Sequence, residues 1–138
     1  MKIHIIEKGT FVGVLYELTI DASIASFVGA EFYKDRFPSK IDLRDDSQQQ
    51  LKDVVQLLGV FEWQGKYLTP TTDDGVSWSL EVECPDRIVR CYGENGYPSY
   101  KAHETTSGFE ERFGLLRSAI FSALKLSVPY GWKPERSE

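Results

Sequence analysis

Hydrophobic and polar residues alternate from Val76 to Gly93, and this alternation predicts a β-hairpin. Every second position of its first half is apolar, with serine or glutamate between: Trp78, Leu80, Val82 and Cys84. A period of two places the two sets on opposite faces of a strand. Pro85 and Asp86 then interrupt the run with residues that favour a turn. The chain is therefore expected to reverse at this point and to pair with itself.

A turn at Pro85-Asp86 also predicts which residues face each other across the hairpin. The opposed pairs are Trp78 with Gly93, Leu80 with Cys91, Glu81 with Arg90 and Val82 with Val89. Apolar residues then meet apolar residues and an acid meets a base, as stable cross-strand pairs require. A shift by one residue would set Val82 against Arg90 and turn the apolar set of the second strand to the wrong face.

The same register separates the two cysteines of the chain. Cys84 lies beside the turn, whereas Cys91 lies about 13 Å away along the ladder at the usual rise per residue. A disulfide cannot cross that distance. We therefore expect two free, buried thiols that act as small hydrophobic residues, as in a reducing compartment.

Two segments have the apolar spacing of amphipathic helices. The first is expected to be capped by Asp46 or Ser47 and to end at Gly59. The second opens on a capping box formed by Ser107 and Glu110. Their apolar stripes are Leu51, Val54, Val55 and Leu58 in the first helix, and Phe109, Phe113, Leu116, Ile120 and Leu124 in the second.

The other segments predict further strands. Lys2–Glu7 and Phe11–Ile20 are rich in β-branched and aromatic residues. Val60–Trp63 and Lys66–Thr69 are expected to flank a turn and to lead into the hairpin. The stretch from Asp21 to Asp35 fits either a helix or a strand. Strands and helices do not alternate regularly, so the sequence predicts one α+β domain over residues 1–138, an antiparallel meander with both helices on one face.

Charge and composition exclude several classes of protein. The net charge of −5 disfavours a nucleic-acid-binding protein, which would need a basic surface. No apolar run approaches the length of a membrane span, and the charges at Glu7 and Lys8 interrupt the first apolar run too early for a signal peptide. We therefore expect a cytoplasmic protein whose partner, if it is a protein, is basic.

Catalytic motifs are not recognisable in the chain. The two histidines, His4 and His103, have no serine or cysteine and carboxylate at the spacing of a known triad. Neither a phosphate-binding loop nor a dinucleotide fingerprint is present, so no cofactor is expected. Asp42, Asp45 and Asp46 form an acidic cluster that is interpreted as the start of a helix, whose dipole favours acids, and not as a metal site.

One group of residues is a candidate binding surface. The predicted register brings the loop before the hairpin and the loop after it to the same end. The residues expected to gather there are Asp73, Asp74, Glu94, Asn95, Tyr97 and Tyr100. Three interpretations remain open: turn chemistry alone, an acidic and aromatic rim that contacts a protein, or a divalent-cation site.

The order of several motifs resembles a family of short uncharacterised bacterial proteins. In this chain the motifs are Trp63, Tyr67, Asp74-Gly75, Trp78, Leu80, Tyr92-Gly93, Asn95 and Tyr97-Pro98, followed by an amphipathic helix. The family is similar in its W…Y…DGxxWxL…YGxNxYP pattern, which corresponds here to Leu51–Leu124. The resemblance implies the fold and carries over no catalytic residue.

Two classes of function agree with these observations. The first is a small non-enzymatic protein-binding domain, of the inhibitor or immunity type, that covers a basic site on its partner with an acidic, aromatic rim. The second is a small-ligand-binding or hydrolytic domain with a pocket between sheet and helices, in which Glu81, Glu83 or Glu94 acts as acid or base. Small size, acidity and the lack of catalytic motifs favour the first class.

Overall fold

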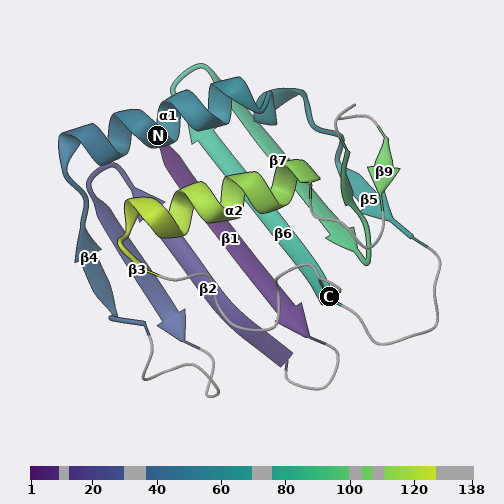
Figure 1. Ribbon diagram of the computed structural model, residues 1–138, viewed down its shortest axis with the longest axis horizontal. Coiled ribbons are helices and arrows are strands. Elements are labelled where there is room, and N and C mark those ends of the chain that lie inside the picture. Colours follow the sequence, from purple (N-terminus) through teal and green to yellow (C-terminus); the bar gives the residue numbers. More distant parts are fainter. Residues whose placement is uncertain (10–12, 30–36, 70–75, 100–103, 107–110, 127–138) are drawn as a thin grey trace, which may run out of the picture.

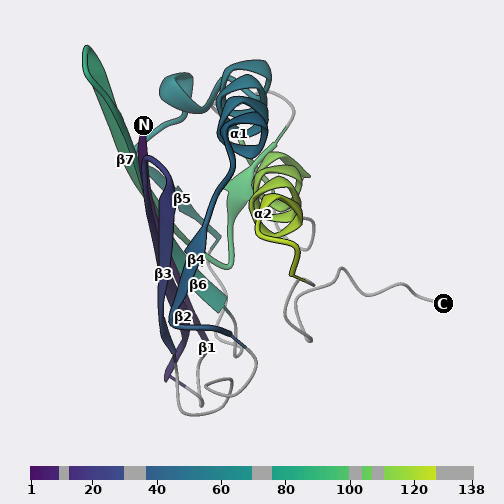
Figure 2. The same ribbon diagram turned by 90° about the vertical axis from the view of Figure 1, so that its left-hand side faces the viewer.

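The protein forms a curved sheet with two helices on one of its faces (Figure 1 and Figure 2). The computed structural model describes residues 1–9, 13–29, 37–69, 76–99, 104–106 and 111–126. The sheet has seven strands in the order β4-β3-β2-β1-β6-β7-β5, and β8 and β9 form a separate pair. The predicted α+β class, with a mostly antiparallel sheet and two helices packed on it, is confirmed.

Twelve helices and strands follow one another along the described part of the chain. They are β1 (Lys2–Gly9), β2 (Gly13–Asp21), β3 (Ile24–Gly29), β4 (Lys40–Asp42), α1 (Asp45–Leu57), the 3₁₀ helix η2 (Val60–Glu62), β5 (Lys66–Leu68), β6 (Val76–Cys84), β7 (Arg87–Glu94), β8 (Tyr97–Pro98), β9 (Thr105–Thr106) and α2 (Glu111–Ala123).

The predicted hairpin is confirmed in its position and in its register. Strands β6 and β7 pair so that Trp78 faces Gly93, Leu80 faces Cys91 and Val82 faces Val89. On its other side β6 pairs with β1, so the first strand of the chain lies at the centre of the sheet. This pairing joins residues that are far apart in sequence.

Two segments differ from the sequence-based prediction. Val60–Glu62 is a 3₁₀ helix and not part of a strand, because Gly59 ends α1 in the left-handed conformation (φ 63°) and the indole of Trp63 donates back to the carbonyl of Leu58. The strand that follows, β5, pairs with β7 in parallel, so the sheet is not a pure antiparallel meander. The ambiguous stretch after Asp21 begins with a strand, since Ala22 adopts a positive φ of 55° and turns the chain directly into β3.

The start of α1 also differs from the prediction. The helix begins at Asp45 with Arg44 in the capping position, and no side chain caps it, so neither Asp46 nor Ser47 has that role. Asp46 instead accepts a hydrogen bond of 2.7 Å from Arg44, which lowers the pKa of its carboxyl group. The predicted capping box at Ser107 and Glu110 lies outside the described residues.

The helices cover the sheet with most of their predicted apolar stripes, of which Val54 is only partly buried and Phe109 lies outside the described residues. In α2 and just after it, Phe113, Leu116, Ile120 and Leu124 are buried; in α1, Leu51 and Val55 are buried. Each of the five long strands contributes its alternate, inward-facing residues to the same core, which lies between the sheet and the helices. Neither of the two described α-helices covers the opposite face of the sheet (Figure 2).

The indole of Trp78 occupies the centre of an aromatic cluster at one end of this core. It stacks on Tyr97 with the rings 8° from parallel, and its Nε1 donates to the carbonyl of Gly96 at 2.9 Å. The facing residue in β7 is Gly93, and a Cβ atom there would lie 2.3 Å from Nε1 of Trp78. The cross-strand partner of Trp78 therefore has to be a glycine.

A buried ion pair lies beside this cluster. Glu7 is at an inward-facing position of β1 and is fully buried. Its carboxylate accepts hydrogen bonds from the guanidinium of Arg117 in α2, at 2.9 Å, and from the hydroxyl of Tyr16 in β2. Because a buried charge is costly without such partners, this contact ties α2 to one position on the sheet.

Both cysteines are free thiols, as predicted. They differ in environment, because Cys91 is buried whereas Cys84, next to the turn, is only half-buried. The prediction that both are buried is therefore wrong for Cys84. Burial raises the pKa of the Cys91 thiol to about 12.

We expect Gly93→Ala to destabilise the fold by about 1–3 kcal/mol, the usual cost of overpacking a tight core site. Thermal or denaturant unfolding measures the loss. Gly65→Ala is the matched control, since a Cβ atom at Gly65 meets nothing within 4 Å. Equal stability of the two variants would contradict the assigned contact between Trp78 and Gly93.

We expect Glu7→Ala to cost about 3–5 kcal/mol, because Arg117 loses the carboxylate that faces it in the core. Replacing both residues with apolar ones, in Glu7→Leu with Arg117→Met, should recover much of this loss. The cycle consists of Glu7→Leu alone, Arg117→Met alone and the double variant, and urea unfolding measures the free energy of unfolding of each. If the double variant loses as much free energy of unfolding as the two single variants together, the two residues do not act as one unit.

We expect the two thiols to react at different rates in the folded protein. With a pKa of about 12, only about one Cys91 thiol in 10,000 is ionised at pH 8, and the thiolate is the reactive form. A thiol reagent should therefore modify Cys84 quickly and Cys91 only after unfolding, with two equivalents in total. Fast reaction of both thiols in the folded protein would contradict this assignment. So would the lack of any reaction after denaturation.

Candidate functional site

The face of the sheet that the helices leave uncovered carries the candidate site. The outward positions of the five long strands form rows across the sheet, because neighbouring strands are in register. From β3 to β7, one row is Val28, Glu17, Ile6, Ser79 and Tyr92; the next is Ser26, Thr19, His4, Glu81 and Arg90. We call this surface the open face.

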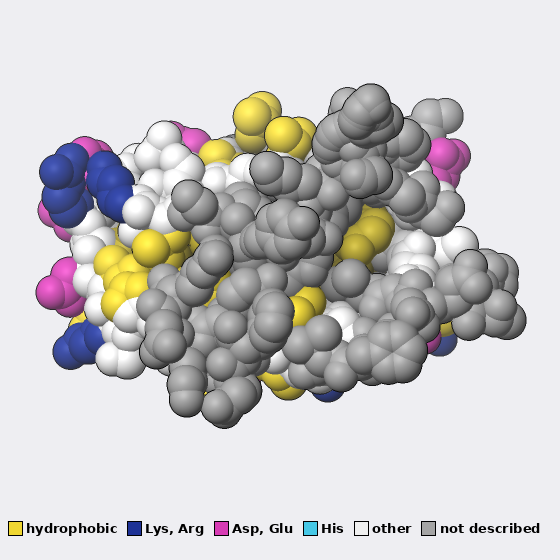
Figure 3. Space-filling view, turned by 60° about the horizontal axis from the view of Figure 1, so that its bottom comes forward, with side chains coloured by type: hydrophobic (Ala, Val, Ile, Leu, Met, Phe, Trp, Pro, Cys, Tyr) yellow, Lys and Arg dark blue, Asp and Glu magenta, His cyan; other side chains and the backbone are white. Residues whose placement is uncertain are grey.

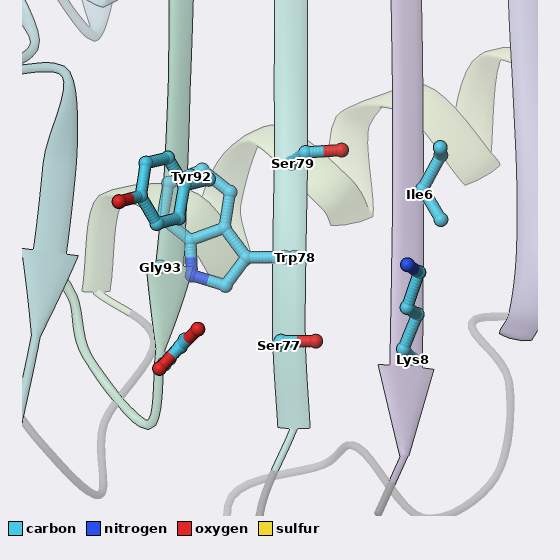
Figure 4. A pocket seen from close by; sticks show the side chains of 8 residues that line it. Ile6, Lys8, Ser77, Trp78, Ser79, Tyr92 and Gly93 are labelled. Atoms are coloured by element: carbon cyan, nitrogen blue, oxygen red, sulfur yellow. The ribbon is translucent and has the colours of Figure 1, made fainter. Parts of the chain in front are cut away.

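A hollow of about 280 Å³ lies on the open face along the first residues of β6 (Figure 4). Ser77 and Ser79 point outward from β6 between longer side chains of the two neighbouring strands. Ile6 and Lys8 of β1 form one side, and Tyr92 and Glu94 of β7 form the other. The hollow exists because serine side chains are short and their neighbours are long. We call it the β6 trough.

The two sides of the β6 trough carry opposite charges. Lys8 faces Ser77, and Ser77 faces Glu94, so the ammonium and the carboxylate belong to one row across three strands. None of the ion pairs between described residues involves Lys8 or Glu94. Both side chains are exposed, and both charges are therefore available to a ligand or a partner.

Tyr92 is the large aromatic side chain of the β6 trough. It is 42% exposed and lies on the opposite side of β7 from the indole of Trp78, which fills the core (Figure 4). Tyrosine offers a rigid apolar surface with a polar end, and it is enriched in the energetically important part of protein interfaces. Its place beside two available charges makes it the strongest single candidate for a contact residue.

A second hollow of about 290 Å³ lies further along the same strands and is more polar. Its lining residues are Lys2, His4, Thr19, Glu81 and Glu83. Nε2 of His4 lies 2.7 Å from a carboxylate oxygen of Glu17, a cross-strand partner that the sequence pattern had not indicated. Among the described residues that line this hollow there is neither serine nor cysteine, so the pair does not form a hydrolytic triad there.

The structure describes three of the six residues predicted to form an acidic, aromatic rim. Glu94 is exposed at the end of β7, and Asn95 follows it with a positive φ of 54° and is half-buried. Tyr97 is only 6% exposed and packs on Trp78 and Phe113. The packing interpretation therefore describes Tyr97, whereas Glu94 and Asn95 keep side chains that a partner can reach. Asp73, Asp74 and Tyr100 lie outside the described residues.

Acidic residues elsewhere do not form a metal site within the described part of the chain. Of the cluster at Asp42, Asp45 and Asp46, the first belongs to the short edge strand β4 and the other two to the first turn of α1. Figure 3 shows acidic and basic side chains together at the end of the molecule where α1 begins. No helix among the described residues is long and apolar enough to cross a membrane.

Comparisons with protein-family models, with curated proteins and with solved structures find no match for this chain. The resemblance to short bacterial proteins therefore stays a prediction from the motifs. Most of those motif residues, including Trp63, Tyr67, Trp78 and Tyr97, are buried. In the described structure these motif residues therefore pack the core.

Sequence reasoning missed most of the β6 trough. The hairpin register alone already placed Ser77 and Ser79 on the same face as Tyr92 and Glu94, and that signal could have been used. The other side, with Lys8, depends on the pairing of β1 with β6. No local pattern indicates which strand lies beside β6, so this half of the trough could not be found from the sequence.

Proposed function

We propose that this protein is a small, non-enzymatic protein-binding domain that contacts its partner through the open face. The observation that carries the proposal is the exposed Tyr92, which lies next to Glu94 on one side of a hollow of that face, with Lys8 on the other side. Aromatic residues in such recesses are the usual energetic centres of protein interfaces.

The size of the open face supports a protein partner. Five strands at the usual spacing are about 24 Å wide, and eight residues of a strand are about 27 Å long. The face therefore covers about 650 Å², close to the roughly 800 Å² that each partner contributes to a standard interface. Exposed apolar side chains are spread over it among the charges: Val14, Ile24, Val28, Ile88 and Tyr92.

The charge of the five long strands on the open face supports a basic partner. On these strands acidic side chains outnumber lysine and arginine: the acids are Glu17, Asp21, Glu81, Glu83 and Glu94, and the bases are Lys2, Lys8 and Arg90. The whole chain is also acidic, with a net charge of −5. Such a field accelerates the encounter with a basic surface. An inhibitor or immunity protein that covers a basic active site on a toxin or defence effector has this character.

A second function is favoured by one observation. The imidazole of His4, paired with Glu17 at the hollow lined by Glu81 and Glu83, could bind a small polar ligand or exchange a proton with it. This second hollow lies on the open face, whereas the sequence predicted a ligand pocket between the sheet and the helices. A ligand that binds there would shift the NMR signals of the His4 ring.

We expect Tyr92→Ala to weaken binding of a partner captured from extracts of the source organism by at least about 30-fold, the loss expected for an interface hot spot. Calorimetry with the purified partner measures it. Leu115→Ala is the matched control, since Leu115 is 54% exposed on α2, in the other layer. Thermal melts should show both variants folded, because each side chain is at the surface.

Glu94→Gln should act differently from Tyr92→Ala. It removes one charge from the edge of the contact surface, so we expect slower association and a weaker dependence on salt, with little change in dissociation. The proposal is contradicted if no protein is retained above the level of blank beads. It is also contradicted if Leu115→Ala weakens binding while Tyr92→Ala leaves it unchanged.

A further inference from the structure

The β6 trough has a repeat that matches an extended peptide. Ser77 and Ser79 point outward two residues apart along β6, which corresponds to about 6.7 Å at the rise of a strand. The neighbouring strands are in register, so Lys8 and Glu94 flank Ser77, and Ile6 and Tyr92 flank Ser79. The trough therefore consists of two successive rows, and each row has one flanking side chain from β1 and one from β7.

An extended peptide lying along the trough would present its side chains to the two sides in turn. Successive side chains of an extended chain point in opposite directions, and every second one lies about 6.7 Å further on. A peptide of four residues would therefore place two side chains against β7, at Glu94 and Tyr92, and two against β1, at Lys8 and Ile6. The hydroxyls of Ser77 and Ser79 would lie beneath its backbone, and each can donate to a carbonyl or accept from an amide.

The chemistry of the four flanking side chains selects the four residues of the peptide. A basic side chain complements Glu94, and an acidic one complements Lys8. An aromatic side chain suits the ring of Tyr92, and an aliphatic one suits Ile6, which is half-buried. When the first side chain of the peptide lies against Glu94, the alternation between the two sides orders them as basic, acidic, aromatic, aliphatic, and the opposite chain direction gives the reverse of that order.

We infer that the β6 trough binds an extended segment of the protein partner with the pattern basic–acidic–aromatic–aliphatic, read in one of the two chain directions. The inference rests on the proposed function, because it names the segment of the partner that meets Tyr92 and Glu94. It goes further in assigning Lys8 to an acidic side chain of an otherwise basic partner.

Two blocked synthetic peptides test the pattern: acetyl-Ser-Arg-Glu-Phe-Leu-Ser-amide and its reverse, acetyl-Ser-Leu-Phe-Glu-Arg-Ser-amide. Each is compared with the peptide in which arginine and glutamate exchange places. Titration of isotope-labelled protein, followed by amide chemical shifts, gives the affinities. For one chain direction we expect the patterned peptide to bind about five- to tenfold more tightly than its exchanged form, as two exposed charge pairs allow, with the largest shifts at Ser77, Ser79 and Tyr92.

The decisive variant exchanges the two charges of the trough, in Lys8→Glu with Glu94→Lys. Both side chains are exposed, so the fold should persist, and the preference between the patterned and the exchanged peptide should reverse. The matched control is Lys2→Glu with Glu83→Lys. It also exchanges one lysine with one glutamate, here between the neighbouring strands β1 and β6 in another row of the open face, and should leave the preference as it is in the natural protein.

Several results would overturn the inference. One is that none of the peptides shifts the signals of β6 and β7; another is that the preference persists in the Lys8→Glu, Glu94→Lys variant; a third is that the control variant reverses it as well. These failures are distinguishable from a failure of the proposed function. If a captured partner still needs Tyr92 but the peptides show no reversal, the open face binds the partner by another arrangement.

Discussion

The buried contact between Glu7 and Arg117 fixes how the two layers of this protein meet. It joins the central strand of the sheet to α2, across 110 positions of the chain, at 2.9 Å. Each group would be costly to bury without the other, so α2 can slide or rotate little on the sheet. The hydroxyl of Tyr16 donates to Glu7, and the ring of Phe113 lies under the guanidinium of Arg117. One face of the sheet is thereby committed to the helices.

This commitment separates the residues that stabilise the protein from those available for binding. The inward positions of β1, β6 and β7 hold the ion pair, the indole of Trp78 and the glycine that it needs. The outward positions of the same strands hold the β6 trough. Since side chains alternate between the faces of a strand, residues such as Tyr92 can change without disturbing the core.

The sequence predicted what depends on neighbours along the chain. The hairpin register could be read from one turn and two alternating strands, and the apolar stripes of the helices from their spacing. The pairing of β1 with β6 and the parallel pairing of β5 join distant segments, and no local pattern encodes them. Glu7 shows the same limit: it continues the inward series of Ile3 and Ile5, yet its partner Arg117 could not be found without the fold. Within the candidate site, Glu94 was singled out from the sequence and Tyr92 could have been placed from the hairpin register, whereas Lys8 needed the sheet.

Cross-saturation NMR on the complex with a captured partner tests most directly the claim that the open face is the binding surface. Saturation of the partner should pass to outward side chains of the sheet, with Tyr92, Ile6 and Ile88 losing most intensity. The exposed leucines of the helix layer, Leu57 and Leu115, should keep theirs. Loss of intensity at Leu57 and Leu115, with Tyr92 unaffected, would contradict the claim and place the interface on the helices.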